Sequence, residues 1–440
     1  MTAEAIVMNR SAVALAADSA VTVSGPGAFK TFDTANKLFE LIKGSNIGVM
    51  VYNNMSLNGT PWETIIKAYR KDNQGFSSSQ VSDYLEHFLR YLASSTSLLA
   101  EEDDVHGVSS IAFDCLIPVA KSLEARYAEF VTAKGKVIKT KAYAVLNSIC
   151  NEWELAIDSA EDIAGADLIE QSTLKRKYGE EIKDLTLYIF GKFELTSTLI
   201  NRLVKLCLLS VTKQMQNASD SGLVFAGFGT EEYFPSYVST RVSARVLKQV
   251  IRLPESFVQV DVSTPGHIQT FAQDEPALGW ITGISDKTRR HIAEHWNYWI
   301  KRELPRELRK AMPGGTALPA AQRNQFVKHV LELASGQLFN FFEYMDRYEE
   351  EQFIKPLFES VAALPKDELG LLAESLVNIT SLKQRMSVHQ SNTVGGAIDV
   401  ALISIGDGFV WLNRKHYFEE RLNPTWHLTH GAKISTIGEY

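Results

Sequence analysis

The sequence contains few cysteines, and their spacing suggests no pairing. Three occur in 440 residues, at Cys115, Cys150 and Cys207, each in a segment with a helical pattern. A C-x-x-C motif and a zinc knuckle are both missing. This pattern predicts buried free thiols in a reducing cytoplasm rather than a disulfide framework.

Long hydrophobic runs and an excess of basic residues are also missing. No window approaches the roughly twenty apolar residues that cross a bilayer. The formal net charge is −7, without the basic footprint that nucleic acids or anionic membranes attract. The alanine-rich stretch 12–20 could mimic a signal cleavage site. However, Glu4 and the pair Asn9-Arg10 interrupt the apolar core that a secretory signal requires. We therefore expect a cytoplasmic protein that binds neither nucleic acid nor membrane.

The remaining composition is that of an ordinary soluble globular protein, with 45% hydrophobic and 22% charged residues. At 440 residues the chain exceeds one average domain. One enlarged domain, or two to three smaller ones, is expected.

The functional prediction depends on the second residue. Thr2 is small enough for methionine aminopeptidase to remove Met1, which would leave a threonine with a free α-amine. Such a residue carries both a nucleophile, its hydroxyl, and a base, its own amine. The unperturbed pKa of an α-amine is about 8. The amine is close enough to accept the hydroxyl proton directly or through one water.

Four strand-like segments follow the first residue. Residues 2–8 and 11–18 are separated by the polar pair Asn9-Arg10, a pattern typical of a hairpin. A loop with Gly25-Pro26-Gly27 comes next, and then strands at 37–41 and 47–53.

This order resembles the N-terminal region of proteasome β-type subunits, which are N-terminal-nucleophile (Ntn) hydrolases. In that family a threonine begins the mature chain, an A-A-D-like turn ends the second strand, and a lysine opens a short strand. Here Thr2, Asp18 at the end of SAVALAAD, and Lys37 of the segment KLFEL occupy those positions in the same order. The resemblance implies that these three residues are catalytic.

The chemistry of these residue types suits amide hydrolysis. A lysine ammonium beside Thr2 would keep the α-amine neutral and stabilise a developing alkoxide. The Asp18 carboxylate would keep Lys37 charged and oriented. An oxyanion requires backbone N–H donors. Tyr52 and Asn53 stand where the family offers a glycine N–H.

The surroundings of this trio depart from the family pattern. Ala20 replaces the family arginine, and Ser391 or Asn392 stands where the family has a second aspartate. The supporting serine of the family falls near Gln273 or Val394. These differences predict altered rate or specificity and leave the activity itself to be tested.

The predicted elements alternate as strands, helices, strands, helices and strands, which indicates an α+β protein. The family has this order in a four-layer αββα sandwich, here enlarged by helices. A polar loop, Gly395-Gly396 and the strand after them match the last core segment of the family. In the family this segment packs against the active threonine. The resemblance covers residues 1–72, 221–285 and 366–417. We predict three core parts at 1–75, 221–285 and 366–440 (the last with a C-terminal tail), separated by helical insertions at 76–220 and 286–365.

A competing motif lies in the second insertion. His291, Glu294 and His295 match H-x-x-E-H, a spacing with which two histidines bind zinc while a glutamate acts as base. Glu349, Glu350 or Glu351 could supply a third ligand. The histidines His427 and His430 form a weaker candidate. The segment 222–229 lacks the lysine and hydroxyl of a phosphate-binding loop, and its glycines fit strand packing better.

The sequence therefore predicts an Ntn hydrolase that cleaves amide bonds of peptides or proteins and needs no metal or organic cofactor. Members of the family stack into rings, which implies a homo-oligomer. Two alternatives stay open, namely a catalytically silent scaffold with the same fold and a zinc peptidase.

Overall fold

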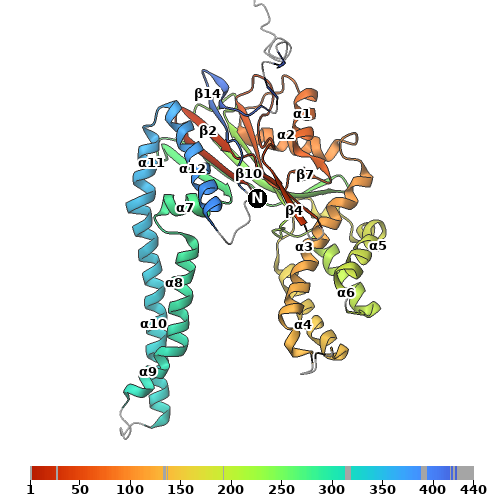
Figure 1. Ribbon diagram of the computed structural model, residues 1–440, viewed down its shortest axis with the longest axis vertical. Coiled ribbons are helices and arrows are strands. Elements are labelled where there is room, and N and C mark those ends of the chain that lie inside the picture. The colour runs from red at the N-terminus through yellow and green to blue at the C-terminus, as the bar shows by residue number, and fades with distance from the viewer. Residues whose placement is uncertain are drawn as a thin grey trace, which may run out of the picture.

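The computed structural model is a mixed α/β protein with antiparallel sheets and many helices (Figure 1). The structure describes residues 2–25, 28–131, 135, 137–191, 193–312, 319–387, 394–416, 418, 419, 422 and 423.

The first sheet brings the two ends of the chain together. The predicted N-terminal hairpin, in which Asn9 pairs with Ala12, forms two of its three interior strands. Strands from distant parts of the chain flank this hairpin on both sides. The five strands in order across the sheet are β13 (Gly266–Ala272), β1 (Ala3–Asn9), β2 (Ala12–Ala17), β14 (Asp399–Ser404) and β15 (Gly408–Asn413).

The second sheet contains the strand that was predicted at 47–53. This strand, β6, lies between β5 and β9. In order across the sheet the strands are β11 (Gln249–Arg252), β10 (Ser236–Val246), β9 (Ser221–Gly227), β6 (Ile47–Asn53) and β5 (Leu38–Glu40), and β12 (Ser256–Gln259) also pairs with β10.

The two sheets share one hydrophobic core. Side chains alternate between the faces of a strand, so Ile6 and Met8 of β1 pack with Met50 of β6 and Val224 of β9. The other face of β1, which includes Val7, packs under helices. Because both faces are buried, β1 and β2 show continuous apolar runs instead of an apolar–polar alternation.

Helices cover the outer face of each sheet. The helix α12 (Lys366–Met386) packs on β1 and β2, with α7 (Glu275–Thr282) and α11 (Lys355–Ala362) beside it. On the second sheet, α1 (Trp62–Asp72) and α2 (Val81–Ser94) pack on the strands through shared apolar side chains. No helix among the described residues is long and apolar enough to cross a membrane.

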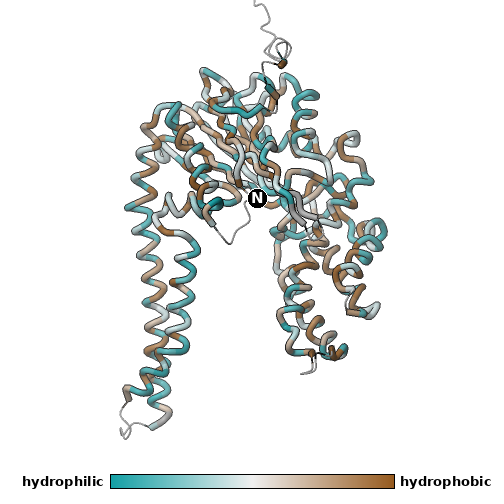
Figure 2. The backbone as a smooth tube through the Cα atoms, viewed as in Figure 1, coloured by the Kyte–Doolittle hydropathy of each residue, from teal (hydrophilic) through white to brown (hydrophobic). Residues whose placement is uncertain are grey.

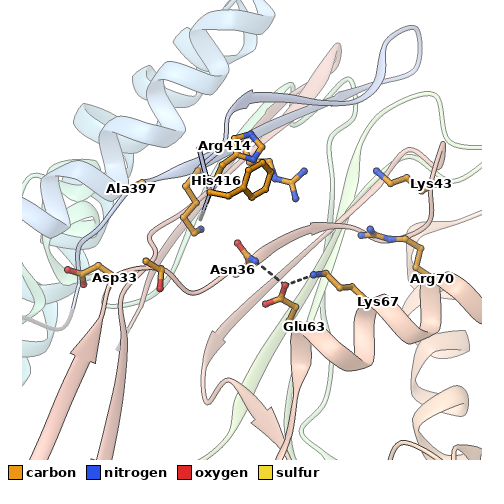
Figure 3. Close-up of a pocket in the computed structure, with 12 residues that line it drawn as sticks. Asp33, Asn36, Lys43, Glu63, Lys67, Arg70, Ala397, Arg414 and His416 are labelled. Atoms are coloured by element: carbon orange, nitrogen blue, oxygen red, sulfur yellow. Dashed lines mark hydrogen bonds and ion pairs between the residues drawn. The ribbon is translucent and has the colours of Figure 1, made fainter. Parts of the chain in front are cut away.

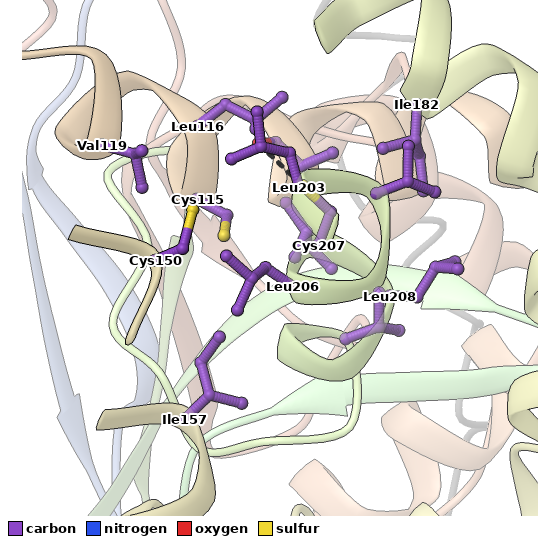
Figure 4. Close-up of a cluster of buried hydrophobic side chains, with 14 of the residues drawn as sticks. Cys115, Leu116, Val119, Cys150, Ile157, Ile182, Leu203, Leu206, Cys207 and Leu208 are labelled. Carbon is purple, nitrogen blue, oxygen red and sulfur yellow. Dashed lines mark hydrogen bonds between the residues drawn. The ribbon is translucent and has the colours of Figure 1, made fainter. Parts of the chain in front are cut away.

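A block of four helices has a hydrophobic core that it shares with the edge of the second sheet, through Ala244 and Val246 of β10 and Ile251 of β11. The three cysteines are free and buried within it, as predicted (Figure 4). One of its helices, α5, was not singled out by the sequence pattern. The block consists of α3 (Asp104–Ala125), α4 (Lys139–Ser159), α5 (Gln171–Phe190) and α6 (Ser197–Ser210), with short 3₁₀ turns at Glu101–Asp103, Tyr127–Glu129 and Ala166–Leu168.

A pair of long helices extends away from the sheets at the left of Figure 1. Each of the two helical segments of this pair contains a short π-helical stretch. We call residues 286–354 the arm. It consists of α8 (Asp286–Tyr298), the π-helical η4 (Trp299–Glu303), α9 (Leu304–Ala311), α10 (Ala320–Glu349) and the π-helical η5 (Glu350–Ile354).

Two local predictions were wrong. The segment after Asp18 was expected to be a loop, but it contains a hairpin of β3 (Val21–Gly25) and β4 (Ala28–Phe32). The sequence Thr60-Pro61-Trp62-Glu63 is typical of a helix start and predicts Thr60 as the cap of α1. In the structure Thr60 lies instead in a small hairpin of β7 (Ser56–Leu57) and β8 (Thr60–Pro61). Its hydroxyl donates to the carbonyl oxygen of Leu98 at 3.2 Å and is therefore not used as a helix cap.

Candidate functional site

Asp18 is the centre of a buried hydrogen-bond cluster. Its Oδ1 accepts from Lys37 Nζ at 2.6 Å and from the Ala3 amide at 3.0 Å. Its Oδ2 accepts from the amides of Ala20 at 3.2 Å and Gly395 at 3.0 Å. Hydrogen bonds to an ionised carboxylate are stronger than those between neutral groups. These four therefore hold the Asp18 side chain in one orientation.

The turn that carries Asp18 is fixed by the loop after α12. The Ser19 amide donates to the Gly395 carbonyl oxygen at 3.1 Å, and the Ser19 hydroxyl donates to the Ala397 carbonyl oxygen. Gly396 has φ +76°, a left-handed backbone conformation that glycine adopts without strain. A Cβ there would lie 2.6 Å from the Asp33 carbonyl oxygen. Gly395 thus contacts the Asp18–Ser19 turn. The backbone conformation at position 396 and the close approach of Asp33 favour glycine there.

Lys37 is fully buried just before β5. Its carbonyl oxygen accepts from the Val51 amide at 2.9 Å, which anchors it to β6. Burial lowers the pKa of Lys37, while the neighbouring Asp18 carboxylate acts in the opposite direction. Because an unpaired buried charge is strongly destabilising, the Lys37–Asp18 ion pair is the arrangement that keeps both charges in this interior position.

Thr2 lies at the same end of the first sheet. The Asp18 carboxylate bonds to the amide of the next residue, Ala3, and the Thr2 carbonyl oxygen accepts from the Gln273 amide at 2.9 Å. The structure therefore brings all three predicted catalytic residues to one region. With Met1 still in the chain, only 1% of the Thr2 surface is exposed.

Sequence reasoning missed a fourth charged residue, Glu4. It is buried, and its two carboxylate oxygens have no hydrogen-bond partner among the described residues. Burial raises the pKa of Glu4 well above its usual range, and the Lys37 ammonium opposes that shift. The available signal was one acid in an apolar strand. Residues two apart share a face, so Glu4 belongs with Ile6 and Met8, whose side chains pack between the sheets.

The Tyr52 side chain fills space between the sheets. Its ring stacks on Phe271 with centroids 5.4 Å apart, and burial raises its pKa. Gly222 is its cross-strand partner, and a Cβ on Gly222 would lie 1.9 Å from Tyr52 Cζ. The tyrosine is therefore accommodated by a glycine on the neighbouring strand. Asn53 ends β6 with φ +63°, a left-handed conformation that asparagine tolerates better than most residues. The oxyanion role of both amides stays a prediction.

The other predicted supporting residues lie in several places. Ser391 and Asn392 fall outside the described residues. Besides its amide contact to Thr2, Gln273 accepts a side-chain hydrogen bond from Gln384 at 3.2 Å. Val394 is buried in the apolar layer under α12.

The zinc motif does not form a metal site in the described part of the chain. His291, Glu294 and His295 are exposed on α8. The Glu349 carboxylate, one proposed third ligand, accepts two hydrogen bonds from Arg289 at 2.8 and 2.9 Å. No group of three His, Cys, Asp or Glu side chains within the described ranges is arranged to hold a metal ion. His427 and His430 lie outside those ranges.

A polar cavity of about 530 Å³ lies beside the segment that precedes Lys37 (Figure 3). Asn36 and Lys67 both donate to Glu63 in its wall, at 3.0 and 2.5 Å. Arg414 and Asp33 also line it, whereas Thr2, Asp18 and Lys37 do not. This surface cavity is thus distinct from the buried Asp18 cluster.

Comparisons with known proteins leave the family open. No protein-family model and no curated protein matches the chain. Among solved structures, it is similar to a Gly-1 mutant of Anbu from Hyphomicrobium sp. strain MC1, at 9% identity over 100% of this chain and 99% of that chain. Anbu from the same strain aligns at 8% identity over 99% of both chains. Each TM-score is 0.27, too low to establish a common fold.

Proposed function

We propose that this chain is a proteasome-like Ntn hydrolase that cleaves amide bonds of peptides or proteins in the cytoplasm. Thr2 is the nucleophile after Met1 has been removed. One observation carries the proposal: a buried Asp18–Lys37 ion pair bonds directly to the amide that follows Thr2. This contact supports the inference that Lys37 and its oriented carboxylate act on the amine that removal of Met1 would create at Thr2.

In the proposed reaction, the Thr2 α-amine accepts the proton of the Thr2 hydroxyl while Oγ attacks the substrate carbonyl carbon. The tetrahedral intermediate expels the amine of the scissile bond, which takes up that proton and leaves an ester on Oγ. Water then attacks the ester, releases the acid product and restores the hydroxyl. Lys37 keeps the amine neutral by charge repulsion, and Asp18 holds Lys37 in place. Backbone amides at Tyr52 and Asn53 would bind the oxyanion.

The architecture supports the same assignment. Two antiparallel sheets share a core, and helices lie on the outer face of each. We interpret this arrangement as the four-layer αββα sandwich of Ntn hydrolases. Because α2 packs on the second sheet together with α1, we place the start of the first insertion after α2 instead of at residue 76. The second insertion is the arm, and a ring-like homo-oligomer is the proposed assembly.

A catalytically silent scaffold is the second candidate. The observation that favours it is the closed site: Thr2 is 1% and Tyr52 6% exposed. In this unprocessed form a substrate carbonyl could not reach Thr2 Oγ. If Met1 were retained in the mature protein, the base would be missing as well.

The test combines intact mass with an epoxyketone probe, which reacts with an N-terminal threonine. The purified wild type should lack Met1 and gain one probe mass on Thr2. Thr2→Ala should gain none, whereas Thr230→Ala, at a threonine outside the cluster, should react like the wild type. Labelling of both Thr2→Ala and wild type, or of neither, would contradict the proposed nucleophile. A retained Met1 would favour the scaffold.

A further inference from the structure

The helices of the arm bury few of their own apolar side chains against one another. Within the described part of residues 286–354, Ile300 and Val327 are the only buried apolar side chains. Many large apolar side chains of the same segment are exposed, and hydrophobic residues recur along its helices in Figure 2. They are Trp296, Tyr298, Trp299, Phe326, Leu333, Phe339, Phe341, Tyr344, Tyr348 and Phe353. Large exposed apolar patches are rare on monomeric soluble proteins and often mark an interaction site.

The exposed residues of α10 are arranged on one face. Phe326, Leu333, Phe341, Tyr344 and Tyr348 are separated by seven, eight, three and four residues. Side chains at three, four or seven residues apart lie on the same side of a helix. Val327 lies on the side that faces α9 and η4. The apolar stripe therefore borders the contact between the two helices at Phe341, which also lines the hollow between them, and remains exposed along the rest of α10.

An apolar hollow lies between the helices near the middle of the arm. Its volume is about 260 Å³, and Trp296, Trp299, Leu338 and Phe341 contribute to its walls. The two tryptophan rings meet edge to face with centroids 5.7 Å apart. A hollow of this kind accepts a large apolar side chain from another helix.

Charge is divided along the length of the arm. Near its tip, five cationic side chains surround Val327 and Leu331. Only two of the five form an ion pair with a described carboxylate, and in each case the partner is Glu303 or Glu307 of the same segment. The cationic residues are Lys301, Arg302, Arg306, Arg309 and Lys310.

The base of the arm (286–292 and 343–354) has a small net negative charge of −2, because Asp286 and five acids of the second helix outnumber the cations Lys287, Arg289, Arg290 and Arg347. Two of its acids, Asp346 and Glu349, pair with Arg289 across the two helices. Among the others, Glu350 has a distant contact of 4.0 Å to Lys355. The five acids of the second helix are Glu343, Asp346, Glu349, Glu350 and Glu351.

We propose that the arm pairs in antiparallel fashion with the arm of a second copy of this chain. The basic tip of each arm then lies against the acidic base of the other, and the apolar stripes and hollows close on one another. An isologous contact of this kind requires a self-complementary surface, which the division of charge supplies. The result is a four-helix bundle.

Other arrangements fit these observations less well. Parallel pairing would bring the two basic tips together and the two acidic bases together. A nucleic acid or an anionic membrane would contact the tip but leave the apolar stripe near the base uncovered. The 30 residues of α10 span about 45 Å at 1.5 Å per residue, long enough to keep opposite charges apart within one arm. The second copy is therefore the partner that satisfies both charge and apolar surface.

Charge reversal tests the pairing directly in the full-length protein. One variant reverses the tip with Lys301→Glu, Arg302→Glu and Arg309→Glu. A second reverses the base with Glu343→Lys, Glu350→Lys and Glu351→Lys. Each variant alone should lose arm-dependent association by at least tenfold in analytical ultracentrifugation. An equimolar mixture, or one chain carrying all six changes, should regain it.

A matched control reverses three exposed cations of the helical block, Lys175→Glu, Arg176→Glu and Lys205→Glu, and should associate like the wild type. A monomeric wild type at micromolar concentration, or a mixture that fails to recover, would overturn the proposal. The same holds if the tip variant differs from wild type only in binding to single-stranded DNA or to vesicles of anionic lipid. Thr2→Ala should leave association unchanged, which separates this inference from the proposed reaction.

Cysteine cross-linking gives the orientation. The three native cysteines are buried, so an introduced surface cysteine is the reactive one. Gln337→Cys, near the middle of α10, should form a disulfide with its own copy under mild oxidation, whereas Lys328→Cys, towards the tip, should not. Cross-linking at both positions would indicate parallel arms, and cross-linking at neither would exclude arm pairing. Circular dichroism and intact mass confirm that each variant is folded and complete.

Discussion

Two regions depart from the usual rule that charged side chains are exposed and apolar side chains are buried. One is the end of the first sheet that holds Thr2 and Asp18, and the other is the arm. At the first, charged side chains lie inside: Asp18 and Lys37 have no exposed side-chain surface. Along the second, aromatic side chains lie outside, with Tyr344 58% exposed. Buried charges and extended apolar surfaces are both uncommon in folded proteins. Each therefore requires a partner that compensates for it.

The partner is internal in one region and external in the other. Asp18 receives its four hydrogen bonds from residues of the same chain, and these fix the orientation of its carboxylate. The arm has no such internal partner among the described residues, so its surface is available to a second chain. The comparison separates a buried cluster whose polar groups are paired within the chain from a surface whose apolar groups are not covered within it, and substitutions can test each side of it.

The largest effect is expected for Asp18→Ala. It leaves the Lys37 ammonium buried without its carboxylate, a change that typically costs about 3–5 kcal/mol. Urea unfolding monitored by circular dichroism measures it. The double variant Asp18→Ala with Lys37→Met should recover part of the loss, because the uncompensated charge is gone. A loss in Asp18→Ala below about 1 kcal/mol, the value of an exposed pair, would show that the pair is solvated.

Glu4→Gln should stabilise the protein at neutral pH. A buried, unsatisfied polar group costs about 1–3 kcal/mol, more when it is charged, and an amide removes the ionisable group. The folded-state pKa of Glu4 is raised, so the folded state holds its proton more tightly than the unfolded state, whose carboxyl has a pKa of about 4.3. The stability of the wild type must then fall as pH rises above that unfolded value.

The free energies of unfolding of the wild type and Glu4→Gln, measured between pH 4 and 8, check the direction of this pH dependence. The advantage of the variant should grow with pH and vanish near the unfolded pKa. If Glu4→Gln is less stable throughout, Glu4 is ionised and paired with Lys37. Glu307→Gln on the exposed surface of the arm serves as the matched control.

Gly222→Ala should lower the free energy of unfolding by about 1–3 kcal/mol, the range for overpacking a core. The added methyl meets the rigid Tyr52 ring, since an ideal Cβ would lie 1.9 Å from Cζ. Tyr52→Ala should relieve the clash, so the double variant should be more stable than the sum of the single effects. Additive losses would contradict direct contact between the two positions.

The smallest effect on folding is expected for Leu333→Ser. Leu333 is 55% exposed, and surface substitutions usually change the free energy of unfolding by less than about 0.5 kcal/mol. The dilute monomer should therefore unfold like the wild type while association of arms weakens. Leu203→Ser in the core of the helical block, where the side chain is buried, gives the contrasting large loss of folding stability. A strongly destabilised Leu333→Ser monomer would mean that this face is covered within one chain.

Local pattern predicted several elements well. The strand predicted at 47–53 agrees with β6, and the hairpin predicted at 2–8 and 11–18 agrees with β1 and β2, because these segments are apolar and have recognisable ends. The hairpin β3–β4 was missed, since its Gly-Pro-Gly sequence also suits an open loop. Glu4 was visible as one acid in an apolar strand. Its burial depends on the second sheet, which comes from distant parts of the chain.

The sequence by itself determined the order and spacing of Thr2, Asp18 and Lys37, the division into strand-rich and helical parts, and the burial of three free thiols. Those features follow from short-range periodicity and residue chemistry. Only the tertiary structure decided that the Gly395 amide completes the shell of Asp18, that Tyr52 lies over Gly222, and that the arm leaves an apolar stripe exposed. Each of these is a contact, or the lack of one, between residues far apart in the chain, and local periodicity carries no information about such pairings.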